Sequence, residues 1–167
     1  MRQWRPGLLS AAVVLFALPA LAISPDEVVG TWRLVSDVRQ AVGSDKIENN
    51  LGEAPAGVLI ITPEHRFIAL FTAADRHPPR TTEDFARLQN SEIAYTGRVS
   101  FEPDPADPNR LKMTNKVDIA WNVEWAGSTQ VRYLSIAGNQ LTIRTPPIKN
   151  PYSGGNAVST LVFERAR

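Results

Sequence analysis

The chain has 167 residues, with 18 basic and 17 acidic side chains, two His and no Cys. This length suits one domain, and the near-neutral, interspersed charge excludes the basic patch that binds nucleic acid or an anionic membrane surface. Two His without Cys provide too few nitrogen and sulfur ligands for a zinc or haem site, so no cofactor is expected.

The first 22 residues are predicted to be a secretory signal peptide. Arg2 and Arg5 precede an apolar run over 7–22 that ends in the small-x-small sequence Ala20-Leu21-Ala22. A basic start, an apolar stretch and such an ending are typical of an exported chain. The run is shorter than the ~20 apolar residues of a membrane-spanning helix. Cleavage after Ala22 would leave one domain, 23–167, which is periplasmic or secreted and has no integral membrane segment.

The rest of the chain is dominated by segments in which apolar and polar residues alternate. Turn-forming sequences separate most of these segments, and the stretch 81–90 is predicted to form a short helix within a long connection. Eight strands are predicted, over 31–42, 57–63, 65–73, 92–104, 110–121, 130–136, 140–145 and 159–165.

Short connections favour antiparallel neighbours, and closure of the sheet removes its exposed edges. The sequence therefore predicts an all-β fold, an eight-stranded antiparallel up-and-down barrel. Such a barrel has an interior wide enough for side chains or for one small ligand.

Strict alternation also predicts which side chains face the interior. In the first strand, it places Val38 on the face of Trp32 and puts Asp37 and Arg39 on the opposite, polar face. In the segment 110–121, the same alternation groups Ile119 with Asn115.

Several sequence stretches, taken in order, resemble the lipocalin-like domain family of the calycin superfamily, as found in exported bacterial proteins. They are "VVGTWRLVS" (28–36), "GEAPAGVLIITPEHRFIAL" (52–70), "EIAYTGRVSF" (92–101), "WAGSTQVRYLSIAGNQLTIRTPP" (125–147) and "LVFER" (161–165). The resemblance implies that Trp32 plugs the closed end of the barrel, that Arg165 covers it and that Gly30 lets the chain approach. Asn115 stands in place of the His that the family commonly has before the Trp of its W-x-G sequence.

Three polar residues are predicted to face the lumen. Arg132 shares a face with apolar residues, where an unpaired charge is costly. One hypothesis makes Arg132 the anchor of a ligand carboxylate, with Tyr95 and Asn115 fixing the orientation of the ligand. The other pairs Arg132 with Glu92 or Asp118 in a buried ion pair.

Four further residues are candidate site residues, three of them at the barrel mouth. Trp121 and Trp125 either line the mouth and stack on a ligand or cap the rim of the core. Arg76 lies in the long connection and either enters the mouth as part of a lid or stays a solvated charge. Glu92 is the nearest candidate for acid–base chemistry, together with Tyr95.

The chain lacks a Cys nucleophile, a Gly-x-Ser-x-Gly sequence, a P-loop and a GxGxxG sequence. The first hypothesis is an exported barrel, a monomer or weak dimer, that binds a small, mostly apolar or amphipathic molecule in its lumen and is not an enzyme. The alternatives are an isomerase or cyclase that acts on an apolar substrate in the barrel, and a filled barrel with a structural or interaction role.

Overall fold

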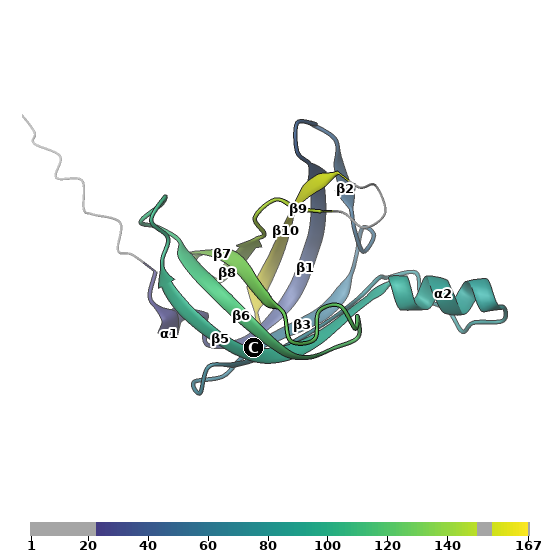
Figure 1. The fold of residues 1–167 in the computed structure, drawn as a ribbon, viewed down its shortest axis with the longest axis horizontal. Coiled ribbons are helices and arrows are strands. Elements are labelled where there is room, and N and C mark those ends of the chain that lie inside the picture. The colour runs from purple at the N-terminus through teal and green to yellow at the C-terminus, as the bar shows by residue number, and fades with distance from the viewer. Residues whose placement is uncertain (1–22, 150–154, 167) are drawn as a thin grey trace, which may run out of the picture.

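A computed structural model of the protein describes residues 23–149 and 155–166, so the predicted signal peptide lies outside the described residues. Each barrel strand pairs with its neighbours in antiparallel fashion, and the pairing of the first strand with the last closes the sheet. This confirms the predicted eight-stranded barrel (Figure 1). The barrel strands are β1 (Gly30–Ala41), β3 (Ala56–Ile61), β4 (Arg66–Thr72), β5 (Glu92–Pro103), β6 (Leu111–Ala120), β7 (Thr129–Ala137), β8 (Gln140–Arg144) and β10 (Asn156–Arg165).

Two short strands extend the barrel at its edges. β2 (Ile47–Asn49) folds back on the end of β1, and β9 (Ile148–Lys149) pairs with the start of β10. Segments of two or three residues are too short to show a periodicity, which is why the sequence pattern did not predict them.

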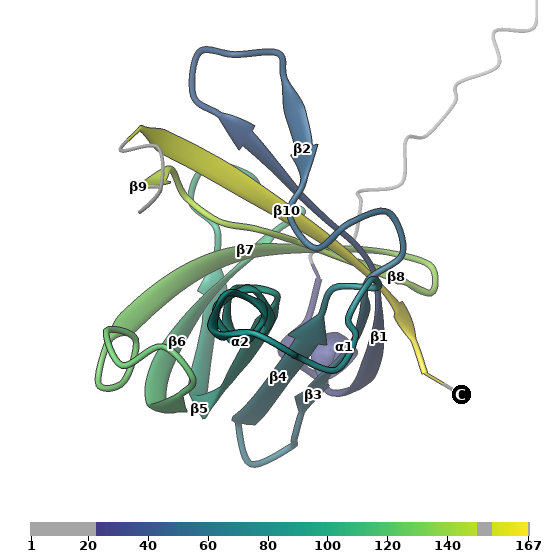
Figure 2. The same ribbon diagram turned by 90° about the vertical axis from the view of Figure 1, so that its right-hand side faces the viewer.

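The predicted short helix is present as α2 (Thr82–Asn90). Thr81 caps its N-terminus: the Thr81 side chain accepts a hydrogen bond from the main-chain N–H of Asp84, and the Asp84 side chain accepts one from the main chain of Thr81. No residue of α2 is buried, and the helix extends away from the barrel in Figure 1 and is seen end-on in Figure 2.

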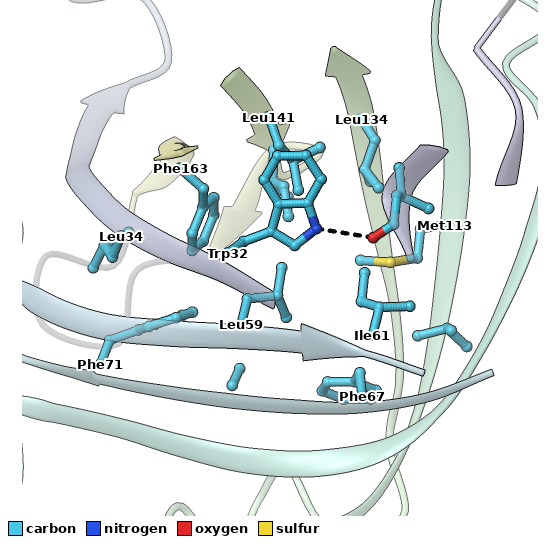
Figure 3. Close-up of a cluster of buried hydrophobic side chains, with 14 of the residues drawn as sticks. Trp32, Leu34, Leu59, Ile61, Phe67, Phe71, Met113, Leu134, Leu141 and Phe163 are labelled. Carbon is cyan, nitrogen blue, oxygen red and sulfur yellow. Dashed lines mark hydrogen bonds between the residues drawn. The ribbon is translucent and has the colours of Figure 1, made fainter. Parts of the chain in front are cut away.

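The two ends of the barrel differ. The helical turn α1 (Pro25–Val28) lies at the end where β1 begins, which we call the floor. At the opposite end, the mouth, are the β2 hairpin and the connection that carries α2. A cluster of buried side chains fills the barrel around Trp32 (Figure 3), among them Leu59, Ile61, Phe67, Met113, Leu134, Leu141 and Phe163.

Two β-bulges change which residues face the interior. The register of β1 against β10 shifts between Leu34 and Ser36, so Asp37 points inward with 2% of its surface exposed, and the predicted inward position of Val38 is wrong. The pairing of β5 with β6 skips Asp118, so Ile119 lies on the outer face and is 68% exposed, contrary to the prediction.

Candidate functional site

The floor of the barrel is closed by the stacked side chains of Trp32 and Arg165. Trp32 is fully buried, and its Nε1 donates a hydrogen bond to the carbonyl of Val28 at 2.9 Å. The guanidinium carbon of Arg165 lies 4.1 Å from the centroid of the indole ring. Its Nη1 donates to the carbonyl of Val29 at 3.0 Å, and its Nη2 donates to a carbonyl of α1. These contacts tie the last strand to the segment that precedes the first.

Gly30 stands where the chain enters the floor. Its φ of 134° lies in a backbone region that residues other than glycine rarely adopt. A Cβ at this position would also lie 2.8 Å from Nη1 of Arg165. The role of Gly30, Trp32 and Arg165 in this arrangement is structural, because the floor is packed and does not line the cavity described next.

A cavity opens above the packed floor and contains about 680 Å³ of empty space, its opening included. Its wall is mostly apolar but carries several polar groups, a combination that provides both affinity and orientation for a small molecule. The apolar residues are Leu59, Phe67, Phe71, Ile93, Met113, Ile143, Ile148, Leu161 and Phe163, and the others are Asp37, Arg39, Asn50, Tyr95, Asn115, Trp125, Arg132, Thr145 and Ser159.

A second hollow of about 910 Å³, open solvent included, lies at the mouth. Five residues line both spaces, which are therefore adjacent: Arg39, Asn50, Ile93, Trp125 and Ile148. Of the predicted site residues, Tyr95, Asn115, Trp125 and Arg132 line the cavity, whereas Glu92 and Trp121 line the mouth beside Trp125.

A chain of aromatic rings connects the core with the mouth. Ring centroids are separated by 5.1 Å between Phe67 and Tyr95, by 5.2 Å between Tyr95 and Trp125, and by 4.7 Å between Trp125 and Trp121. All three pairs are edge-to-face, an arrangement that the charge distribution of aromatic rings favours. Trp121 also donates a hydrogen bond from Nε1 to the carbonyl of Gln89 in α2, at 3.2 Å. One continuous aromatic surface therefore runs from the cavity to the base of α2.

Arg132 is buried, with 9% of its surface exposed, and is held by neighbours on its own strand. Its Nη1 donates to the carbonyl of Val131 at 2.7 Å, and its Nη2 donates to Oε1 of Gln130 at 2.6 Å. Neither proposed ion pair is present: Glu92 binds Arg76 at 3.1 Å, and Asp118 binds Arg66 at 2.7 Å.

These contacts also place Arg76 and Glu92. Arg76 donates to Glu92 and to the carbonyl of Ser91 beside the mouth, and it is not among the residues that line the cavity. Within residues 23–149 and 155–166, no hydrogen bond joins Glu92 to Tyr95, which lines the cavity. The structure therefore does not assemble Glu92, Tyr95 and Arg132 into one group.

Asp37 and Asn115 are the most deeply buried polar residues of the cavity wall. Asn115 is 1% exposed, and its Oδ1 has no hydrogen-bond partner. Oδ2 of Asp37 accepts a hydrogen bond from Nδ2 of Asn50 at 2.8 Å, whereas its Oδ1 has no partner. Burial raises the pKa of Asp37, and the hydrogen bond from Asn50 and the charge of Arg39 partly oppose that shift.

Asp37, Arg39 and Asn50 were missed as site residues by the sequence analysis. Alternation alone assigned the first two to the outer face, because a bulge leaves no mark in the residue pattern of one strand. The third lies in the connection after β2, where no periodicity applies.

The described part of the chain holds no group of three or more His, Asp or Glu side chains that is arranged to bind a metal ion. Nor does any helix in it have the length and apolar character needed to span a membrane.

A search of curated proteins finds no match to the chain. The sequence model of a family described as "lipocalin-like domain" matches residues 29–166, which include all eight strands of the barrel. The predicted family is confirmed, and the chain belongs to the lipocalin-like domain family.

Proposed function

We propose that the protein binds a small, mostly apolar or amphipathic molecule inside its barrel. The observation that carries this proposal is the cavity above the packed floor, which has a largely apolar wall and opens at one end. A barrel with a purely structural role would gain stability by filling this space with side chains. The packed cluster around Trp32 instead gives way to open space above it.

Burial of apolar surface would provide most of the affinity. Each Å² removed from water contributes about 25 cal/mol. A ligand that buries a few hundred Å² would therefore bind with a dissociation constant on the order of micromolar after the cost of association. Tyr95 and Trp125 offer aromatic faces and edges to such a ligand along its path from the mouth.

We further propose that the protein acts outside the cytoplasm, in the periplasm or as a secreted protein. The support is the basic start, the apolar run and the Ala20-Leu21-Ala22 ending of the first 22 residues. Cleavage after Ala22 would leave a mature domain that begins at Ile23, and this domain would bind the ligand outside the cytoplasm. N-terminal sequencing of the protein recovered from outside the cytoplasm would test the cleavage site.

The binding proposal is tested by native mass spectrometry of the gently purified protein, followed by solvent extraction. We expect a discrete added mass, which the extract identifies. In parallel, N-phenylnaphthylamine, an apolar dye whose fluorescence rises in apolar surroundings, should bind the extracted protein.

A variant that fills the cavity shows where the dye binds. Ser159 lines the cavity and is 7% exposed, so Ser159→Phe projects a ring into that space and should abolish dye binding. Thr114→Val, on the outer face of β6, is the control and should leave binding unchanged. If no added mass is found, and if the dye binds Ser159→Phe as well as the wild type, ligand binding in the lumen is refuted.

A further inference from the structure

The polar groups left unpartnered in the cavity wall are hydrogen-bond acceptors. Asp37 lies on β1 and Asn115 on β6, so strands far apart in the chain contribute one buried acceptor each to the same cavity. Each residue is at least nine-tenths buried, and in each the Oδ1 atom has no partner in the protein. An acceptor without a partner in an apolar site is costly, and a ligand that donates to it removes that cost.

The orientation of the Asp37 carboxylate is determined by two hydrogen bonds with one neighbour. Its main-chain carbonyl accepts from the main-chain N–H of Asn50 at 2.9 Å, and its Oδ2 accepts from the side chain of Asn50 at 2.8 Å. Because Oδ2 is held in this way, Oδ1 is the oxygen that lacks a partner. An ionised carboxylate can only accept hydrogen bonds.

Arg132, the residue that would attract an acidic ligand, makes two hydrogen bonds within the protein and has no carboxylate partner among the described residues. Each of its two terminal nitrogens donates to an oxygen of the protein, one to Val131 and one to Gln130. The cavity wall therefore carries two unpartnered acceptors as well as the cations of Arg39 and Arg132.

We propose that the ligand of this cavity carries a hydrogen-bond donor, such as a hydroxyl, phenol or amine group, and donates it to Oδ1 of Asp37, with Asn115 as a second acceptor. The ligand class that this predicts is an apolar alcohol or amine. This inference rests on the proposed binding function and specifies the chemical class of the ligand.

The test compares three probes with the same naphthalene ring substituted at the same position: naphthol, its methyl ether and naphthoate. Naphthol donates and accepts hydrogen bonds, the ether only accepts, and naphthoate is an anion. Dissociation constants are measured by displacement of N-phenylnaphthylamine at mildly alkaline pH, chosen to favour the ionised form of the Asp37 carboxyl because burial raises its pKa. We expect naphthol to bind about tenfold more tightly than its ether, the size of effect typical of one hydrogen bond to a buried or charged acceptor, and more tightly than naphthoate.

Asp37→Asn inverts the polarity of the site with little change of shape. The new amide oxygen would accept from Asn50, so the amide NH₂ group would take the place of Oδ1 and present a donor to the cavity. The preference for naphthol over its ether should be lost or reversed. Asn115→Leu, similar in size, should reduce the preference without abolishing dye binding. Thr114→Val, on the neighbouring outward-facing position, should have no effect. Urea unfolding of each variant shows that it is folded.

Three results would overturn the inference. If naphthol and its ether bind the wild type equally, the acceptors do not select a donor, although binding itself stands. If naphthoate binds most tightly and Arg132→Leu removes that preference, the ligand is an acid anchored by Arg132. If neither the dye nor any of the three probes binds and no mass co-purifies, the proposed function fails, and this inference fails with it.

Discussion

The contact between Arg165 and Trp32 leads to a quantitative prediction about stability. Arg165→Met keeps a long apolar side chain over the indole ring but removes two hydrogen bonds to main-chain carbonyls and the cation–π contact. Hydrogen bonds to charged groups contribute about 1.5–3 kcal/mol each, and we take the lower value because this arginine is partly exposed. The cation–π contact adds about 0.5–1 kcal/mol. Packing retained by the methionine offsets part of this sum, so we expect a loss of about 2–3 kcal/mol.

Urea unfolding, followed by tryptophan fluorescence, measures this loss. With a slope of about 2 kcal/mol per molar urea, the midpoint should fall by about 1–1.5 M. The control is Arg33→Met, which removes an ion pair with Glu164 between the same two strands. Both side chains of that pair are largely exposed, so its loss should cost less than about 1 kcal/mol. If the two variants are equally stable, or if Arg165→Met loses less than about 0.5 kcal/mol, the reasoning about the floor is wrong.

Three further variants test other parts of the structure. Gly97→Ala places a Cβ 2.0 Å from the main-chain carbonyl oxygen of Lys116, which cannot move aside as a side chain can. The free energy of unfolding, measured in urea, should therefore fall by about 3 kcal/mol. Gly155→Ala is the control and should be near neutral, because the space around Gly155 is open. Because burial raises the pKa of Asp37 above its value in the unfolded chain, the contribution of that carboxyl to stability falls as the pH rises over the range above about 4. Asp37→Asn should therefore gain stability relative to the wild type over this range, and a constant difference between the two unfolding curves would contradict the pKa shift. Trp121→Phe removes the hydrogen bond to α2 and should speed amide hydrogen exchange in that helix, and unchanged exchange rates would show that the bond does not hold it.

The alternation of residues was sufficient to predict the barrel because every long strand has one face in the interior. Period-two patterning in eight segments, with turn-forming sequences between them, identified the strands within a few residues of their observed ends. The amphipathic pattern over 81–90 likewise predicted α2. Each of these features depends on residues close together in the chain, and for this reason one sequence was enough.

The interior of the cavity depended on pairings that no single strand encodes. Asp37 faces inward because β1 bulges against β10, and Ile119 faces outward because the register of β5 and β6 skips a residue. Arg132 has no carboxylate partner within the described ranges because Glu92 and Asp118 lie nearer to other arginines. Side-chain direction in a strand reverses with each one-residue shift of register, and the shift is set by the partner strand. The sequence by itself therefore determined the barrel, whereas the tertiary structure decided which polar groups line its lumen.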